Sequence, residues 1–481
     1  MMSRRSFMGA LSASAVAPSI ARADTPPLNV LYISSDEHNP ALMGGHPVVS
    51  TPNLDRMAAQ SLSCNRSYVA SPVCAPTRQS WLTGLHPWEH GQLGNEYQFA
   101  GADPTVIESF RAAGYQTTCL GKLHTWSSER DGDLGFDSIL NEKSGEAWTE
   151  VHRRWRISRE QPEFDTADAP LFATMPFGQR FSGRVRPDPG SCGSWLLTQQ
   201  AGQALRNTGS QPFFLYVGLR SPHYPFDLPR PWYHRFNPDE MPGAFGPPSS
   251  LSRGTQLQAH RRGWGGLSSE HHRLLQARYY AAVEYTDYLV GLVLDELEAT
   301  GQADNTLVVY TSDHGDMAGE RGCWLKHTMF DASARKPLLI RGAGLPTGNY
   351  DHLLSEVDVL PTIAALAGIP HPFEISGRDL SGALRSGSSG RETCFASDFI
   401  NEKGEMAMTM ARGKRFKLTR YAAPTWGKES VELFDMEQDP GEEQDLAPDP
   451  LYKPVVDELL SREQAWRAGL RAPRQAPKRH A

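Results

Sequence analysis

Closely paired cysteines, long hydrophobic runs and clusters of basic residues are all missing from this 481-residue sequence. Its six cysteines lack the short, paired spacing of zinc modules and disulfide-rich scaffolds. No apolar stretch reaches the roughly 20 residues needed to cross a bilayer, so we expect no stable membrane span. The net charge of −7 comes without a Lys/Arg block and gives no electrostatic reason to expect nucleic-acid binding.

What the chain does contain is enough apolar material for a large folded core. Hydrophobic residues make up 39% of the sequence and aromatic residues 9%, which argues against wholesale disorder. At about 100–200 residues per domain, the length fits two or three domains, or one large α/β domain with an appendage.

The first 23 residues have the features of an export signal. The paired Arg4 and Arg5 precede a weakly hydrophobic stretch over residues 9–20, and residues 21–23 (ARA) have the form of a signal-peptidase site. Paired arginines in this position resemble a twin-arginine signal, which directs the export of an already folded protein. We therefore predict a signal peptide over residues 1–23, the twin-arginine export machinery as a partner, and a periplasmic or secreted mature protein.

Four short apolar runs each end in polar side chains. The runs are residues 28–34, 117–120, 212–219 and 305–311. Helix-like segments lie between them, the clearest at residues 270–300, and this alternation indicates a mostly parallel sheet covered on both faces. The polar residues that follow the runs are Asp36, Glu37, Lys122, His124, His223, Asp313 and His314. Because ligands bind where parallel strands end, we expect these side chains to meet at one edge of the sheet.

The pattern changes near residue 385. Residues 384–391 are rich in serine and glycine and predict a linker or loop. Beyond them, residues 406–411 and 415–421 predict a β-hairpin, residues 431–436 a further strand, and residues 454–470 a terminal helix. We therefore expect a main α/β domain over residues 24–384 and a small antiparallel subdomain over residues 385–481.

Cys74 stands at the predicted start of a helix. Pro76 suits a first helical turn, and Arg78 lies one turn further in. The partial positive charge of a helix N-terminus stabilises anions. A lone cysteine more often packs in a core than reacts, so these features alone leave Cys74 as either a packing residue or a nucleophile.

Two multi-residue motifs and several shorter ones follow one another along the chain. Residues 74–78 (CAPTR) fit the pattern C-x-P-S/T/A-R, and residues 114–124 fit G-Y-x-T-x-x-x-G-K-x-H. The shorter motifs are residues 51–55 (TPNLD), 312–316 (SDHGD), 432–435 (ELFD) and 439–440 (DP). Together they resemble the type I sulfatases of the alkaline-phosphatase-like superfamily, from residue 28 to residue 447. The resemblance implies an α/β fold in which helices sandwich a mostly parallel sheet, with a small antiparallel C-terminal subdomain.

The resemblance also implies hydrolysis of a sulfate monoester to sulfate and an alcohol. In that family a separate maturation enzyme oxidises the cysteine to formylglycine, so a formylglycine-generating enzyme is an expected partner. One hydroxyl of the hydrated aldehyde at residue 74 would attack sulfur, and the second would allow sulfate to leave. The other catalytic candidates are Arg78 and Lys122, which hold the diol, Asp313 as base, His223 or Lys326 as proton donor to the alcohol, and His124 as proton acceptor during sulfate release. The expected substrate contacts are Asn95, Lys122, His223 and Lys326.

One divalent metal ion follows from the same resemblance. Its expected ligands are Asp36, Glu37, Cys74, Asp313 and His314, with Glu37 either ligating the ion or turning away from it. Carboxylates favour a hard cation, so Ca²⁺ is the first expectation, with Mn²⁺ or Mg²⁺ as alternatives. The Asp-His pair resembles the choline-sulfatase-like and phosphonate-monoester-hydrolase-like branch, where many sulfatases have Asp-Asn.

Two other functions stay open at this point. The Asp313-His314 pair permits a phosphonate monoester or phosphodiester hydrolase on the same site, although Thr77 before Arg78 favours sulfate. A non-catalytic protein that binds sulfate or glycans, with Cys74 kept as a thiol, is the third hypothesis. Such a protein would have no need of the full set of catalytic side chains.

Overall fold

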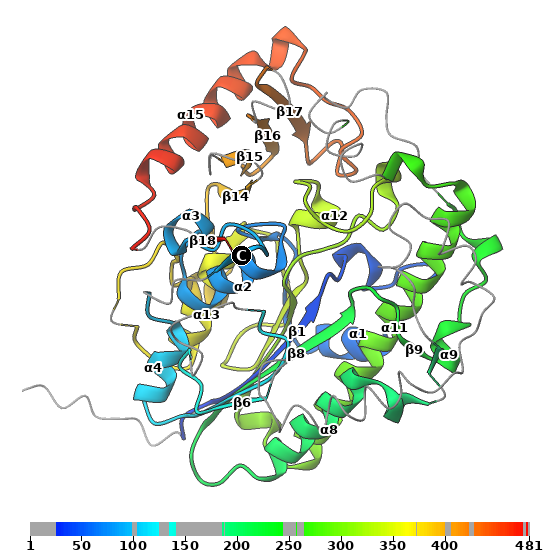
Figure 1. Ribbon diagram of the computed structural model, residues 1–481. Coiled ribbons are helices and arrows are strands. Elements are labelled where there is room, and N and C mark those ends of the chain that lie inside the picture. Colours follow the sequence, from blue (N-terminus) through cyan, green and yellow to red (C-terminus); the bar gives the residue numbers. More distant parts are fainter. Residues whose placement is uncertain are drawn as a thin grey trace, which may run out of the picture.

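An eight-stranded sheet between two layers of helices forms the larger part of the structure, and a four-stranded sheet with one long helix lies beside it (Figure 1). The computed structural model describes residues 26–98, 103–124, 134–140, 185–186, 188–243, 256, 264–371, 373–399, 406–422, 428–474 and 478–479. The predicted signal peptide, residues 1–23, lies outside these ranges. Among the helices within them, none combines the length and apolar character needed to cross a membrane.

The strands of the main sheet run in the order β12-β2-β11-β10-β1-β8-β5-β6. Their bounds are β1 (Asn29–Asp36), β2 (Leu62–Cys64), β5 (Gln116–Gly121), β6 (Ser138–Leu140), β8 (Phe213–Pro222), β10 (Thr306–Ser312), β11 (Leu338–Arg341) and β12 (Gly348–Tyr350). β1 pairs in parallel with β10 and β8, and β5 pairs in parallel with β8 and β6. β11 runs antiparallel to both of its neighbours. The mostly parallel sheet predicted from the sequence is confirmed.

The four strands expected from the apolar runs are neighbours, in the order β10-β1-β8-β5. All four extend beyond the predicted carboxyl ends, β5 and β10 by one residue each, β1 through Asp36 and β8 through Pro222. Because all four run in parallel, their carboxyl ends lie at one edge of the sheet.

Alternate side chains of β1 enter the two helical layers. Leu31 and Ile33 pack into one hydrophobic core with α1, α8, α9 and α11, whereas Val30 and Tyr32 pack into a second core with α2, α4, α13 and α14. The helices of the first layer are α1 (Pro52–Ala58), α8 (Gly193–Arg206), α9 (Arg230–Tyr233) and α11 (Ser269–Ala299); those of the second are α2 (Cys74–Thr83), α4 (Val106–Ala112), α13 (Glu356–Leu366) and α14 (Ser381–Ser386). β1 is therefore buried along its whole length, as its continuous apolar sequence predicts.

The smaller sheet has the antiparallel order β14-β15-β16-β17. Its strands are β14 (Cys394–Phe399), β15 (Met406–Arg412), β16 (Phe416–Tyr421) and β17 (Ser430–Asp435), and the terminal helix is α15 (Lys453–Gly469). Val456 and Leu459 of α15 pack on Leu418 and Leu433 of the sheet. Another cluster joins Met408 and neighbouring residues of this sheet to Tyr68 and Met329 of the α/β part. The predicted hairpin, third strand and terminal helix are all present.

Short elements complete the described chain. They are α3 (Pro87–His90) and α12 (Asp331–Ala334), the strand pairs β3 (Ser67–Tyr68) with β13 (Leu354–Ser355), β4 (Tyr97–Gln98) with β18 (Lys478–Arg479) and β7 (Val185–Arg186) with β9 (Leu228–Pro229), and the 3₁₀ turns η1 (Pro40–Leu42), η2 (Pro189–Ser191), η3 (Pro238–Glu240), η4 (Trp264–Gly266), η5 (Ala303–Asn305), η6 (Glu320–Gly322) and η8 (Pro450–Tyr452).

The predicted linker over residues 384–391 begins too early. α14 continues to Ser386, and the Leu384 side chain is buried in the core that contains α13. The helix ends at Gly387, whose φ of 69° gives the left-handed conformation that glycine tolerates best. Burial of one leucine thus outweighs the serine- and glycine-rich composition around it.

Glycine is required where β5 and β8 come closest. A Cβ at Gly121, which has φ +86°, would lie 2.2 Å from the carbonyl oxygen of Gly218, while Gly114, also at φ +86°, has nothing within 4 Å of such an atom. We expect Gly114→Ala to cost about 1 kcal/mol from backbone strain alone, and Gly121→Ala about 2 kcal/mol more because of the added clash. Thermal unfolding of the two purified variants measures this difference, and equal unfolding temperatures would contradict it.

Candidate active site

The structure brings the polar residues predicted at the strand ends together at one edge of the sheet. Asp36 ends β1, Lys122 and His124 follow β5, His223 follows β8, and Asp313 and His314 follow β10. Asp36 and His314 have no exposed surface, and Asp313 is 3% exposed. Charged groups buried this deeply need partners, and each of them has one nearby.

Cys74 is the first residue of α2, so its side chain lies at the positive end of that helix. Its Sγ lies 3.0 Å from Lys326 Nζ, 3.2 Å from His314 Nε2 and 3.7 Å from Asp36 Oδ1. The thiol is therefore surrounded by residues that come from three separate parts of the chain. The sequence-based expectation of a helix start at Cys74 is confirmed.

Asn95 supports the beginning of α2. The cap residue Val73 offers no side-chain hydrogen bond, and Asn95 Oδ1 accepts one from the backbone N–H of Ala75 at 3.0 Å. This bond orients the turn that carries Cys74. The substrate contact expected of Asn95 stays a prediction.

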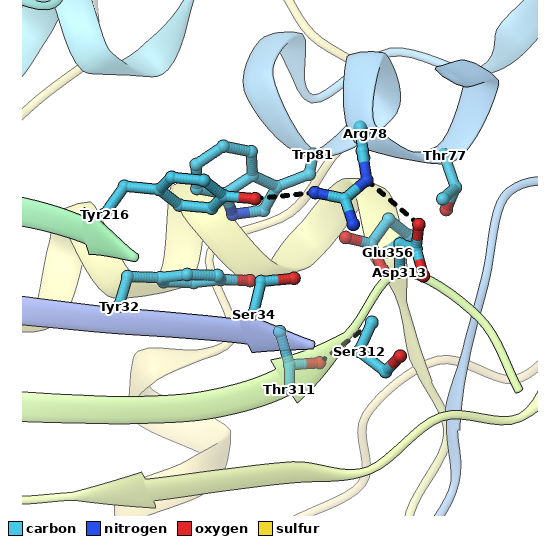
Figure 2. A pocket seen from close by; sticks show the side chains of 10 residues that line it. All are labelled: Tyr32, Ser34, Thr77, Arg78, Trp81, Tyr216, Thr311, Ser312, Asp313 and Glu356. Atoms are coloured by element: carbon cyan, nitrogen blue, oxygen red, sulfur yellow. Dashed lines mark hydrogen bonds and ion pairs between the residues drawn. The ribbon is translucent and has the colours of Figure 1, made fainter. Parts of the chain in front are cut away.

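Arg78 ties α2 to the end of β10 (Figure 2). Its Nε donates to Asp313 Oδ2 at 2.9 Å, and its Nη1 donates both to the Lys122 carbonyl and to the Tyr216 hydroxyl at 2.7 Å. Lys122 Nζ in turn forms an ion pair with Asp36. Two basic residues of the predicted site are thus fixed by two of its carboxylates.

Glu37 and Lys326 form a second group beside the thiol. Glu37 Oε1 lies 3.3 Å from Lys326 Nζ, and Glu37 Oε2 lies 3.5 Å from His223 Nε2. The backbone N–H of Glu37 donates to Asp313 Oδ1 at 3.0 Å. The Glu37 side chain points instead to the two basic groups, Lys326 and His223. Of the two orientations that the sequence left open for Glu37, these contacts favour the one that turns away from a metal.

Four side chains could hold a metal ion. One ligand atom from each of Asp36, Cys74, Asp313 and His314 lies within 4.8 Å of all the others, and all four residues are buried. His314 Nδ1 lies 2.8 Å from the Gly315 carbonyl oxygen. Since a carbonyl can only accept, Nδ1 carries a proton, and Nε2, which faces Cys74, is the nitrogen that could bind a metal ion once it has lost its own proton. Two carboxylates and an imidazole nitrogen fit a divalent cation.

Burial and charge act in opposite directions on the Cys74 thiol. Burial alone would raise its pKa, but the positive charges of Lys122, Lys326 and His314 together lower the pKa well below its usual value. Burial likewise disfavours charge on His314, and here Asp313 and Cys74 prevail and raise its pKa to about 9. The site therefore stabilises negative charge at residue 74.

Burial and neighbouring charges also set the pKa values of the two expected proton donors, His223 and Lys326, and they do so in opposite directions. Burial, reinforced by the charge of Lys326, lowers the pKa of His223 to about 3. Burial also opposes the charge on Lys326, but Cys74 and Glu37 outweigh it and raise the pKa of the ammonium group well above its usual value. At neutral pH, Lys326 is charged and His223 is neutral.

The site also contains two tyrosines that were not predicted from the sequence. Tyr216 of β8 accepts a 2.7 Å hydrogen bond from Arg78, and Tyr279 of α11 donates a 2.6 Å hydrogen bond to the Glu37 carbonyl. Both lie in apolar stretches, where a tyrosine is most simply interpreted as core. Only the pairing of β8 with β5, and the packing of α11 on the sheet, bring their hydroxyls to the site.

An eight-stranded, mostly parallel sheet between helices, with buried acidic and basic residues at its carboxyl edge, is what the resemblance to the alkaline-phosphatase-like superfamily implies. The "Sulfatase" family model matches residues 29–369, and the model "N-sulphoglucosamine sulphohydrolase, C-terminal" matches residues 319–468. The chain therefore belongs to the sulfatase family, as a type I sulfatase, and it is an enzyme.

Individual relatives agree with this assignment. An arylsulfatase of Clostridium perfringens is 26% identical over 90% of this chain and 92% of its own length. A choline-sulfatase of Rhizobium meliloti is 30% identical over 71% of this chain and 68% of its own. The phosphonate monoester hydrolase of Silicibacter pomeroyi shares the fold, with a TM-score of 0.76 at 24% identity over 94% of this chain and 99% of that one.

Metal binding should distinguish the residues of the four-residue cluster, which are the possible ligands, from Glu37. We expect Asp36→Asn and His314→Ala to weaken divalent-metal binding by at least the roughly 10–100-fold typical of changes to supporting residues. Glu37→Gln, the control, should bind the metal within about threefold of the parent, because its carboxylate faces Lys326 and His223 instead. Calorimetric titration of metal-depleted protein with Ca²⁺, Mn²⁺ and Mg²⁺ measures all three variants. An equal loss in Glu37→Gln would make Glu37 a ligand.

Proposed function

We propose that the protein hydrolyses a sulfate monoester at formylglycine 74, with a divalent metal bound by Asp36, Cys74, Asp313 and His314. The observation that carries this proposal is the environment of Cys74. Its Sγ lies at a helix N-terminus, 3.0 Å from the buried ammonium group of Lys326 and 3.2 Å from the imidazole Nε2 of His314. No role in packing calls for such an arrangement, whereas a reaction that develops negative charge at residue 74 does.

Two groups absent from the unmodified chain complete the chemistry. When bound, a divalent cation supplies a Lewis acid that neutralises the sulfuryl oxygens, with Ca²⁺ favoured by the carboxylates and Mn²⁺ or Mg²⁺ as alternatives. Oxidation of Cys74 by the maturation enzyme, followed by addition of water to the aldehyde, would supply a diol, of which one hydroxyl would displace the alcohol from sulfur and the other would allow sulfate to leave. A formylglycine-generating enzyme has to act on Cys74 while the segment is accessible, because the folded side chain is 1% exposed.

The charges of the site suit an anionic substrate. Arg78 and Lys326 are buried, the Lys122 side chain is 10% exposed, and the three are paired with the carboxyl groups of Asp313, Glu37 and Asp36. A divalent cation adds two positive charges to this balanced set, and a sulfate ester brings negative charge. The basic residues therefore need no rearrangement to hold the sulfuryl group, which is the property of a preorganised site.

Asp313 serves better as an anchor and a ligand than as the base expected from the sequence. Its two oxygens accept hydrogen bonds from Arg78 Nε and from the backbone N–H groups of Glu37 and His314. Three such bonds hold the carboxylate in one orientation and occupy the lone pairs with which a base would have to take up a proton.

Lys326 is the better proton donor to the leaving alcohol. It is charged at neutral pH and lies 3.0 Å from Cys74 Sγ, whereas the low pKa of His223 leaves that imidazole without a second proton. His223 then contacts and orients the ester. His124, which hydrogen-bonds the Cys74 side chain, accepts the proton that is lost when sulfate leaves.

The printed names of the relatives suggest the substrate class. They include an arylsulfatase and a choline-sulfatase, and one structural neighbour is titled as a complex with D-glucosamine-2-N,6-O-disulfate. By extension, an alkyl, aryl or carbohydrate sulfate ester is the proposed substrate here. The predicted signal over residues 1–23 adds export in folded form through the twin-arginine machinery, to the periplasm or beyond.

A phosphonate monoester or phosphodiester is the second candidate substrate. The observation in its favour is His314 among the possible ligands, together with the fold shared with phosphonate monoester hydrolases. Parallel assays with an aryl sulfate and a phenylphosphonate ester separate the two, and faster turnover of the phosphonate would reverse the order proposed here.

The modification of Cys74 is directly measurable. In protein made together with a formylglycine-generating enzyme, the peptide that contains residue 74 should lose about 18 Da, because the thiol becomes an aldehyde. Cys74→Ala should abolish sulfate ester hydrolysis, a loss of at least about 1000-fold. Cys119→Ala is a matched control, because Cys119 is also buried but lies within β5, away from the ligand cluster. An active enzyme with an unmodified thiol would refute the mechanism.

Leaving groups of different acidity distinguish Lys326 from His223. Lys326→Ala should slow hydrolysis of a simple alkyl sulfate by about 100-fold or more, and that of 4-nitrophenyl sulfate by less than about tenfold, because nitrophenolate needs no proton to leave. His223→Ala should slow both esters by similar factors if it acts in binding. Steady-state kinetics of both variants on both esters decide the matter, and the reverse pattern would assign the donor to His223.

A further inference from the structure

Tyr216 sits where the two basic segments of the site meet. Its hydroxyl accepts a 2.7 Å hydrogen bond from Arg78 Nη1 and donates a 3.0 Å hydrogen bond to the Lys122 carbonyl oxygen. Arg78 Nη1 also donates to that carbonyl at 2.7 Å, which closes a triangle of three hydrogen bonds. Tyr216 is 1% exposed, and Figure 2 shows its ring beside the Arg78 guanidinium with the hydroxyl directed toward it.

The hydrogen bonds of Arg78 leave one nitrogen for the reaction. Nε is used by Asp313, and Nη1 is used by Tyr216 and the Lys122 carbonyl. Nη2 is buried, has no hydrogen-bond partner among the residues that the structure describes, and lies 3.9 Å from Asp36 Oδ2. A buried guanidinium nitrogen without a partner is costly, so it is well placed to bind an oxygen of residue 74 or of the ester. Its direction depends on what holds the other side of the guanidinium.

A small cavity lies beside Arg78, so the guanidinium needs a contact that fixes its orientation. A cavity of about 10 Å³, room for about one water molecule, is lined by Arg78, Thr77, Tyr216 and Glu356 among others (Figure 2). The guanidinium could rotate toward this space if Nη1 were released. The hydroxyl of Tyr216 opposes that rotation, because it holds Nη1 by a hydrogen bond.

The backbone near Tyr216 allows the Lys122 carbonyl to come close to the tyrosine hydroxyl. A Cβ at Gly218, two residues further along β8, would lie 2.3 Å from the Lys122 carbonyl oxygen and 2.8 Å from the Tyr216 ring. Glycine at this position therefore lets the Lys122 segment approach the phenol. Trp81, one turn after Arg78 on α2, packs on the same ring with 5.0 Å between centroids. Tyr216 thus contacts α2 at two points and the end of β5 at a third.

We propose that Tyr216 is a positioning residue, which acts through Arg78 and the Lys122 carbonyl to aim Arg78 Nη2 at the sulfuryl-transfer site. The inference rests on the proposed function, because it takes Arg78 to contact residue 74 or the ester during the reaction.

Tyr216→Phe removes the hydroxyl and keeps the ring. We expect kcat for 4-nitrophenyl sulfate to fall about 10–100-fold, as for the loss of a hydrogen bond to a charged group, and binding of inorganic sulfate to weaken about tenfold. Tyr32→Phe is the matched control. Tyr32 packs on Trp81 and Tyr216 and lines the same cavity, but within the described chain no hydrogen bond joins it to Arg78. We expect its kcat to stay within about threefold of the parent.

A double-mutant cycle tests whether Tyr216 acts through Arg78. In an Arg78→Lys background, Tyr216→Phe should change kcat by less than about threefold, because the guanidinium that the Tyr216 hydroxyl holds is already gone and only the bond to the Lys122 carbonyl is lost. Equal effects of Tyr216→Phe in both backgrounds, or equal losses of kcat and thermal stability in Tyr216→Phe and Tyr32→Phe, would overturn the proposal and leave a packing role.

Two measurements keep this proposal separate from the proposed function. The mass of the peptide that contains residue 74 shows whether formylglycine is present in each variant, and an unmodified but active parent enzyme refutes the function alone. A crystal structure of Tyr216→Phe should show the Arg78 guanidinium rotated toward the cavity, whatever the substrate is. An Arg78 side chain unchanged in that structure, with unchanged sulfate binding, would refute the role of Tyr216 alone.

Discussion

The ion pair between Arg78 and Asp313 is the interaction on which the site depends. It joins the first turns of α2 to the residue that follows β10, and both partners are buried. Removing one partner of such a pair leaves an uncompensated charge in the interior, which is far more costly than losing an exposed salt bridge. The position of Cys74 at the start of α2 is therefore tied to the same residue that lies in the possible metal cluster.

Charge balance then explains why so many ionisable groups can be buried together. Lys122 pairs with Asp36, and Lys326 pairs with Glu37, so each buried ammonium group faces a carboxylate. Hydrogen bonds from backbone N–H groups stabilise Asp313 further. An arrangement that stabilises the protein without substrate also presents its basic groups to an anion, because a divalent cation can offset the carboxylates when the ester binds.

Most of the fold was predictable because its signals are local. The apolar runs that became β1, β5, β8 and β10 carry their own periodicity and composition, and the Gly301 that follows α11 marks its end. The predicted boundaries were wrong where a contact with residues far away in the sequence determines the local secondary structure. Leu384 looks like part of a flexible linker until α13 provides the core in which it is buried, and β8 extends three residues beyond its apolar run because β1 continues beside it to Asp36.

The sequence by itself determined the family, the cysteine at a helix start and the basic and acidic residues at four strand ends, because motif order and hydrophobic pattern are properties of the chain alone. Only the tertiary structure decided what those residues face. Glu37 next to Asp36 is as good a ligand on paper, yet its side chain pairs with Lys326. Tyr216 is one more aromatic residue in a strand until β5 brings the Lys122 carbonyl to its hydroxyl. Side-chain partners come from segments far apart in the sequence, and their directions depend on how the strands and helices pack.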